Sequence, residues 1–113
     1  MKLSELAFFT DDVASMTAFY RSLLGTEPVH QSGDLAIFDQ QGLQILIHRT
    51  YGAGPGDLPA ENHVAFAVPD LDAACAGLAA AGLECALPPR DYQWGRSAYL
   101  RDPDGHFIEL QQK

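Results

Sequence analysis

The 113-residue sequence has only two cysteines and no apolar stretch that approaches the length of a membrane span. A helix that crosses a bilayer needs about 20 consecutive apolar residues, so we expect no membrane-spanning segment. Cys75 and Cys85 lie too far apart for a metal or redox motif. We expect free thiols, with a disulfide as the less favoured alternative, and a reducing cytoplasm as the location.

Basic residues are also scarce. Seven Lys and Arg residues stand against fifteen Asp and Glu residues, which gives a formal net charge of −8. A chain of this charge repels phosphate backbones and anionic lipids, so we expect neither a nucleic-acid partner nor a membrane partner. A small-molecule partner stays open, because one buried site can oppose the net charge. The hydrophobic share of 47% indicates a globular domain and excludes disorder.

An internal repeat organises the chain. Residues 5–13 (ELAFFTDDV) align with residues 63–71 (HVAFAVPDL) at an offset of 58 positions. Each copy is a short apolar strand followed by an Asp, Asp12 or Asp70, that is placed to cap a helix. Each cap is followed by apolar residues at intervals of three and four, up to Gly25 and Gly82 respectively. The repeat therefore predicts two amphipathic helices.

Three strands are expected after each helix. The predicted class is α+β, with module 1 at about residues 1–50, a Gly- and Pro-rich linker over 51–61, and module 2 at about 62–113. Turn residues separate the strands, including the type I signal over residues 102–105 (DPDG). The predicted strands cover residues 28–31, 35–39 and 43–49 in module 1, and 84–87, 97–101 and 106–111 in module 2.

Two motifs then point to a family. The segment 18–21 (AFYR) precedes Leu24-Gly25, and residues 94–96 (WGR) lead into residues 102–110 (DPDGHFIEL). At this spacing on a two-fold repeat, the chain resembles the vicinal oxygen chelate superfamily. That superfamily includes glyoxalase I, bleomycin-resistance proteins, fosfomycin-resistance transferases and extradiol dioxygenases. The resemblance implies two βαβββ modules whose mixed sheet curls into an open cup, and a homodimer that pairs modules between chains.

The resemblance also implies where metal ligands lie, on the first and last strands of each module. In module 2 these positions hold His63 and Glu109. Imidazole nitrogen with carboxylate oxygen suits a divalent ion such as zinc, nickel, manganese or iron(II). Because side chains alternate along a strand, Phe107 and Gln111 should share the face of Glu109, while Ile108 and Leu110 pack under a helix.

Module 1 departs from this pattern. Glu5 stands where the family has a histidine, and is interpreted either as a second carboxylate ligand or as a solvated residue. Leu46 stands at the fourth ligand position and cannot bind a metal. His48, one pleat further along the strand, is open to four interpretations: a shifted ligand, a substrate contact, a general base or a strand-end histidine.

A candidate ligand wall lies between two strands of module 2. Residues 88–96 contain two prolines, two aromatic residues and two arginines, which suits a lid. Tyr92 and Trp94 would offer aromatic area and Arg96 would hold an anionic group, whereas the alternative is an ordinary surface loop. Phe9, on the same strand face as Glu5, would add an apolar wall.

Two functions from different classes follow. The first is a divalent-metal-dependent enzyme that acts on a small organic substrate with vicinal oxygens, by isomerase, lyase or dioxygenase chemistry, with Glu109 or His48 moving a proton. The second is a non-catalytic binding protein of the bleomycin-resistance type. Leu46, the absence of the family's first-strand histidine, the loop with Tyr92 and Trp94, and the net charge favour this alternative. A structural or regulatory partner is a third and weaker interpretation.

Overall fold

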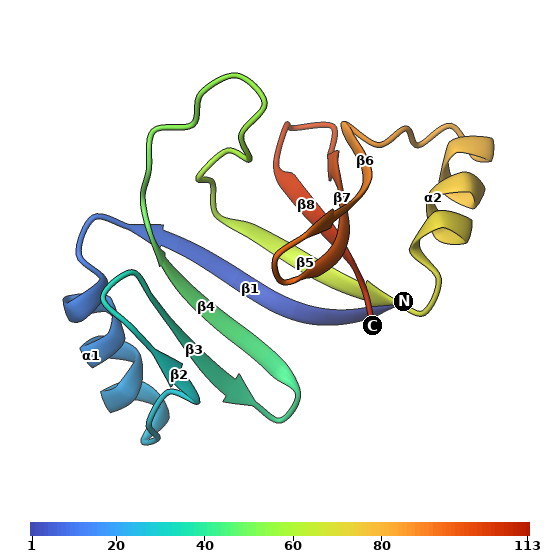
Figure 1. Cartoon of the computed structure of the whole chain (residues 1–113). Coiled ribbons are helices and arrows are strands. Elements are labelled where there is room, and N and C mark those ends of the chain that lie inside the picture. Colours follow the sequence, from blue (N-terminus) through green and yellow to red (C-terminus); the bar gives the residue numbers. More distant parts are fainter. The chain divides into compact units, whose positions relative to one another are not determined.

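The computed structural model describes residues 1–113, and the chain is α+β with one strand-helix-three-strand order repeated twice (Figure 1). The predicted class and element order are confirmed. The first repeat comprises β1 (Lys2–Thr10), α1 (Val13–Leu24), β2 (His30–Gln31), β3 (Leu35–Gln40) and β4 (Leu43–Arg49). The second comprises β5 (His63–Val68), α2 (Leu71–Ala80), β6 (Leu87–Tyr92), β7 (Gly95–Arg101) and β8 (Phe107–Gln112).

Two compact units divide the chain. Residues 5–62 form one unit, which we call the N-terminal unit, and residues 63–113 together with residues 1–4 form the other, the C-terminal unit. The first strand is thus shared: Ser4 donates a hydrogen bond from its hydroxyl to the Ala65 carbonyl oxygen, at 3.1 Å, inside the C-terminal unit. Glu5 is the first residue of the N-terminal unit.

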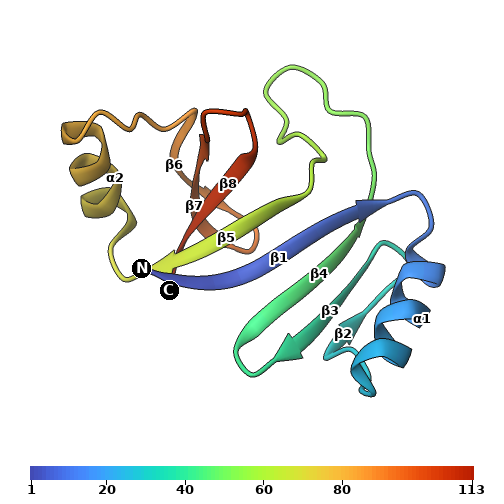
Figure 2. The ribbon, with the colours of Figure 1, turned by 180° about the vertical axis from the view of Figure 1, so that it is seen from behind.

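In the N-terminal unit the strands run in the order β2-β3-β4-β1, and β1 is parallel to β4 (Figure 2). α1 contacts β3 and β4 on one face of these strands. Burial of apolar side chains between helix and sheet stabilises the unit. The buried core of this unit consists of Val13, Ala36, Phe38, Ile45 and Ile47.

In the C-terminal unit the order is β5-β8-β7-β6, and β5 is parallel to β8. Leu110 packs with Leu71 and Cys75 of α2 in the buried core of this unit. Since side chains alternate along β8, Phe107, Glu109 and Gln111 face away from α2. The predicted alternation on this strand is therefore found.

Both helices begin at the predicted caps. The Asp12 carboxylate accepts a hydrogen bond from the Ser15 N–H at 3.0 Å, and the Asp70 carboxylate accepts one from the Ala73 N–H at 3.1 Å. Gly25 ends α1 with φ at 67°, in the left-handed region that glycine adopts without strain. The cap chemistry explains why the helix boundaries could be predicted closely.

The predicted strand over residues 84–87 is wrong, because the strand starts only at Leu87 and continues to Tyr92. Pro88 and Pro89 favoured a loop here. However, β6 is the last strand of the sheet order, so a backbone N–H that points away from β7 has no ladder partner to lose. The register with β7 also shifts between Leu87 and Arg90, so the ladder is interrupted at the two prolines. The segment expected as a lid is thus a β6–β7 hairpin.

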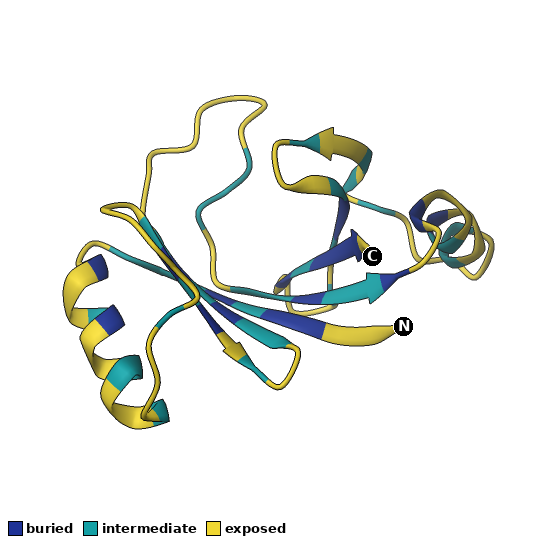
Figure 3. Cartoon of the chain, turned by 60° about the horizontal axis from the view of Figure 1, so that its bottom comes forward, coloured by how far each residue is buried: buried dark blue, intermediate teal, exposed yellow.

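The linker over residues 51–61 has no helix or strand, and most of it is exposed (Figure 3). The Tyr51 hydroxyl connects two parts of this linker by donating a hydrogen bond to the Leu58 carbonyl oxygen at 2.8 Å. Both cysteines are free thiols, and burial, followed by the neighbouring Cys85, raises the pKa of Cys75 to about 12. No helix has the length and apolar character that crossing a membrane requires.

Candidate metal centre

The C-terminal unit brings His63 and Glu109 together. His63 begins β5 and Glu109 lies near the middle of β8, and the parallel register of the two strands sets both side chains on the face away from α2. His63 Nε2 and Glu109 Oε1 are 3.0 Å apart. The side chains are 8% and 4% exposed, so the pair is withdrawn from solvent. Forty-six positions of sequence thus separate two groups in direct contact.

Glu109 is held as a carboxylate. Burial alone would raise the pKa of its carboxyl, but hydrogen bonds from His63 and Ser97 outweigh burial and lower the pKa below its ordinary value of 4.5. The ionised carboxylate accepts, and His63 Nε2 therefore donates. Ser97 donates from its hydroxyl to the second carboxylate oxygen, Oε2, at 2.8 Å.

The donor types of this pair fit a borderline or hard divalent cation. A ligand nitrogen must carry no proton, so a cation shared by His63 and Glu109 would take the place of the proton that lies between them. Both side chains are buried, and their polar atoms have hydrogen-bond partners, since no buried side-chain nitrogen or oxygen lacks one. The position of both side chains is therefore set before any cation binds.

Aromatic rings surround the imidazole. Tyr99 of β7 and Phe107 of β8 stack with ring centroids 4.7 Å apart and planes 7° from parallel. His63 meets both rings edge to face, at 6.3 Å from Tyr99 and 5.8 Å from Phe107. Packing of this kind fixes the orientation of the imidazole ring and lowers the local dielectric constant.

Sequence reasoning missed Ser97. It is fully buried on β7, opposite Gln111 in the β7–β8 register, and its hydroxyl touches the Glu109 carboxylate. The available signal was a small polar residue in an otherwise apolar strand segment (SAYL, residues 97–100). Serine is common in strands, so this signal alone identifies no site.

The N-terminal unit gathers the other predicted residues of β1 and β4 on one face. In the β1–β4 register, Glu5 lies opposite Gln44, and Phe9 lies opposite His48. The same alternation puts Leu46 on this face, which is the face away from α1. Glu5 is 7% exposed. The predicted common face of Glu5, Phe9 and His48 is found, whereas their functional roles stay predictions.

His48 has a defined tautomer when neutral. Its Nδ1 lies 2.7 Å from the backbone oxygen of Arg49, and a carbonyl oxygen only accepts, so Nδ1 carries the proton. Nε2 is then the basic nitrogen. Phe9 and Tyr51 flank the ring, with centroids 5.5 Å and 6.0 Å away. This arrangement suits a proton acceptor or a ligand, and leaves both interpretations of His48 open.

Tyr92 and Trp94 form a stacked pair at the β6–β7 turn, with centroids 4.7 Å apart and planes 4° from parallel. Trp94 is 58% exposed, and the Arg90 guanidinium lies 5.4 Å from the centre of the Tyr92 ring. A cation over an aromatic ring is favourable, and the exposed indole leaves one ring face for a planar partner. A contact of Tyr92 and Trp94 with a ligand stays a prediction.

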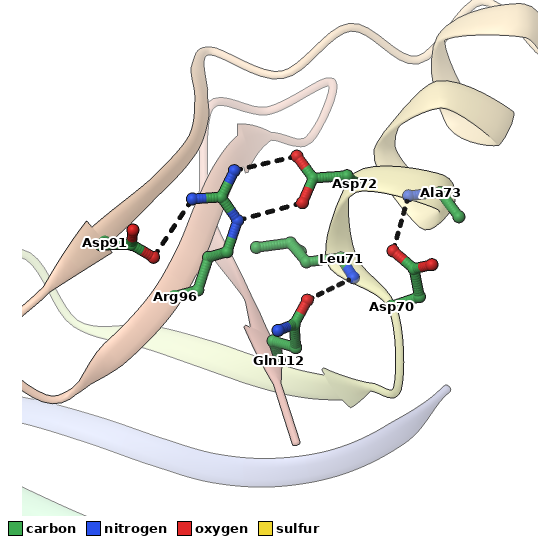
Figure 4. A network of polar contacts seen from close by, with 7 residues as sticks. All are labelled: Asp70, Leu71, Asp72, Ala73, Asp91, Arg96 and Gln112. Atoms are coloured by element: carbon green, nitrogen blue, oxygen red, sulfur yellow. Dashed lines mark hydrogen bonds and ion pairs between the residues drawn. The ribbon is translucent and has the colours of Figure 1, made fainter.

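Arg96 is engaged elsewhere. Its guanidinium donates two hydrogen bonds to the Asp72 carboxylate at 2.9 and 3.0 Å and a third to Asp91 at 3.1 Å (Figure 4). In the same network the Gln112 side chain accepts a hydrogen bond from the Leu71 N–H at 3.0 Å. These contacts fasten the start of α2 to β7 and β8. A substrate contact of Arg96 stays a prediction.

Several solved structures share this fold. A structure described as an NAD-dependent benzaldehyde dehydrogenase from Legionella pneumophila matches with a TM-score of 0.77 at 22% identity, covering 96% of each chain. A hypothetical protein from Bacillus halodurans C-125 matches with 0.79 at 14% identity, covering 99% of this chain and 94% of that one. A methylmalonyl-CoA epimerase from Streptomyces coelicolor matches with 0.71 at 20% identity, covering 100% and 97%. At these identities the likeness concerns the fold.

A match to a family model identifies the family of the chain. A family model described as the Glyoxalase/Bleomycin resistance protein/Dioxygenase superfamily matches residues 2–110, nearly the whole chain. This match agrees with the repeated βαβββ order and with the positions of His63 and Glu109 on the first and last strands of the second repeat. The chain belongs to the Glyoxalase/Bleomycin resistance protein/Dioxygenase superfamily.

Proposed function

We propose that the protein is a divalent-metal-dependent enzyme that acts on a small organic substrate with two neighbouring oxygen atoms. The buried His63–Glu109 pair carries this proposal, because an imidazole and an ionised carboxylate in contact offer one nitrogen and one oxygen ligand, which is half of a typical metal site. Members of the superfamily commonly use divalent metal ions. Isomerase, lyase and dioxygenase reactions are all compatible with the pair.

Glu5 is the third ligand in this proposal. The resemblance implies a ligand at this position, so Glu5 would add a second carboxylate to the imidazole of His63 and the carboxylate of Glu109. Two carboxylates balance the charge of a divalent cation, and imidazole nitrogen with carboxylate oxygen suits zinc, nickel, manganese or iron(II).

The chemistry divides between the ion and the chain. When bound, a divalent ion polarises substrate oxygens as a Lewis acid. His63 and Glu109 would hold the ion, and the hydrogen bond from Ser97 keeps one Glu109 oxygen directed away from His63. His48 accepts or returns a proton at Nε2, since Nδ1 is occupied by the Arg49 carbonyl oxygen. Phe9, Tyr92 and Trp94 would supply apolar area for the organic part of the substrate, and a substrate contact of Arg96 stays a prediction.

Substitution of His63 tests the proposal. Protein is loaded with zinc, nickel, manganese or iron(II) under anaerobic conditions and desalted, and metal per chain is measured by mass spectrometry. We expect one ion per chain in the wild type and a loss of at least about tenfold in affinity for His63→Ala, as expected when one of three ligands is removed. His30→Ala is the matched control, because His30 is exposed on β2.

Equal metal content in the wild type and His63→Ala would reject the site. Equal loss in His30→Ala would show that the effect is not local to β5. Retention of metal by the control, together with loss in the His63 variant, is the result that the proposal requires.

A second function has its own support. Leu46 stands on the face that carries Glu5 and His48, and the exposed Trp94–Tyr92 stack suits a planar apolar ligand. A non-catalytic binding protein would purify without metal and change its Trp94 fluorescence on addition of a cationic aromatic compound. Trp94 is the one tryptophan in the chain, so the signal is unambiguous. Stoichiometric metal in the wild type would count against this alternative.

A further inference from the structure

We infer that Ser97 is a positioning residue for Glu109 and that it links the metal centre to the exposed indole of Trp94. The inference rests on the proposed metal site and adds two residues to it. Neither residue belongs to the ligand set. The linkage is a chain of two hydrogen bonds, Trp94 to Ser97 and Ser97 to Glu109, which lies entirely within the C-terminal unit.

The first link makes the two oxygens of Glu109 different. Ser97 donates to Oε2 at 2.8 Å, and His63 contacts Oε1 at 3.0 Å. The Ser97 side chain is fully buried, so water does not replace its hydroxyl. Loss of this donor would remove one of the hydrogen bonds that restrict rotation of the carboxylate about its last bond, and would leave the bonds from His63 and Gln111. The Ser97 hydroxyl therefore keeps Oε1 directed toward His63, where it could bind a metal ion together with the imidazole.

The second link directs the Ser97 hydroxyl. The indole Nε1–H of Trp94 donates to Ser97 Oγ at 3.3 Å, and an indole nitrogen only donates. With Oγ accepting from Trp94, its own proton is directed to Glu109. The stacking of Trp94 on Tyr92 holds the indole in the required orientation. A partly exposed ring is thus connected, through one buried hydroxyl, to a candidate metal ligand.

Metal affinity gives the first test. Manganese or zinc alone is titrated into metal-free protein, against a competing chelator, for the wild type, Ser97→Ala, Ser97→Thr and Trp94→Phe. Substitution of a residue that orients a ligand typically weakens metal affinity roughly 10- to 100-fold. We expect a loss in this range for Ser97→Ala, recovery in Ser97→Thr, which keeps the hydroxyl, and a smaller loss in Trp94→Phe.

A metal-free measurement gives the second test. The single indole N–H gives one cross-peak in a ¹H–¹⁵N correlation spectrum of labelled protein. In the wild-type background, Glu109→Gln should shift this peak. The effect would reach the indole through Ser97, because Ser97 is hydrogen-bonded to both residues. In the Ser97→Ala background the same substitution should leave the peak unmoved. Circular dichroism of each variant confirms that it is folded.

The outcomes separate this inference from the proposed function. Wild-type protein that binds no metal, but whose indole peak moves in Glu109→Gln, would overturn the metal site and keep the linkage. If the wild type and folded Ser97→Ala bind metal with equal affinity, the positioning role is overturned and the metal site is kept. If Ser97→Ala does not fold, an unmoved indole peak in Glu109→Gln still overturns the linkage.

Discussion

His48 shows how one hydrogen bond sets the tautomer of a neutral imidazole. Its sequence position allowed a ligand, a base, a substrate contact or a strand-end histidine. The contact of Nδ1 with the Arg49 carbonyl oxygen leaves Nε2 as the basic atom. A ligand and a base would both use that atom, and a substrate contact or a strand-end histidine is equally compatible with this hydrogen bond, so all four interpretations stay predictions.

The tautomer of His48 is open to direct measurement. We expect neutral His48 to carry its proton on Nδ1, because the Arg49 carbonyl oxygen accepts there. Long-range ¹H–¹⁵N spectra at alkaline pH distinguish the two ring nitrogens. His30, which is exposed on β2, serves as the reference. A protonated Nε2 in neutral His48 would contradict the assignment and remove the proposed base.

The residues of the candidate site were predictable to different degrees. His63 and Glu109 combine ligand chemistry with the two-residue period of a strand, so family resemblance and alternation located both. Ser97 was not predictable, because its contact with Glu109 depends on the register of β7 against β8. The engagement of Arg96 by Asp72 was likewise hidden, since 24 positions separate the two residues.

At the scale of elements, the two helices follow from their capping residues. Asp12 and Asp70 each accept a backbone N–H three residues later, and the sequence carries this signal locally. β6 was misplaced because two prolines are typical of loops, and only the position of the strand at the sheet edge makes them compatible with pairing. Edge position is a property of the whole sheet, and no local pattern encodes it.

The cap of α1 should make stability depend on pH. The Ser15 N–H, followed by the Ser15 hydroxyl, lowers the pKa of Asp12 below its ordinary value of 3.8. A carboxyl group whose pKa is lower in the folded chain than in the unfolded chain stabilises the fold. This contribution is fully present at pH values above the unfolded pKa, and it is lost as the pH falls through the pKa of the folded chain. We therefore expect Asp12→Ala to lower the melting temperature by a few degrees at pH 7, and by progressively less below about pH 3.8.

Thermal unfolding followed by circular dichroism between pH 7 and pH 3 measures this difference. Asp11→Ala is the matched control, since Asp11 is the exposed neighbour of the cap. A gap between wild type and Asp12→Ala that is constant over the whole pH range would show that the charge of Asp12 does not stabilise the helix.

At the scale of the whole molecule, the repeat explains why the fold could be recognised from sequence. Two copies of one strand-helix-three-strand pattern give two cores with matching roles, one under each helix. The second copy carries an imidazole and a carboxylate on its first and last strands, whereas the first carries Glu5 and, at the corresponding last-strand position, Leu46. The two copies thus differ at the predicted ligand positions. The homodimer stays a prediction, because it concerns surfaces between chains.

The central claim is that His63 and Glu109 hold one divalent cation, and X-ray absorption spectroscopy at the edge of the bound metal tests it most directly. We predict nitrogen and oxygen ligands at about 2.0–2.2 Å, with the scattering pattern of one imidazole that disappears in His63→Ala. A sulfur shell at about 2.3 Å, or an imidazole signal that persists in His63→Ala, would contradict the account.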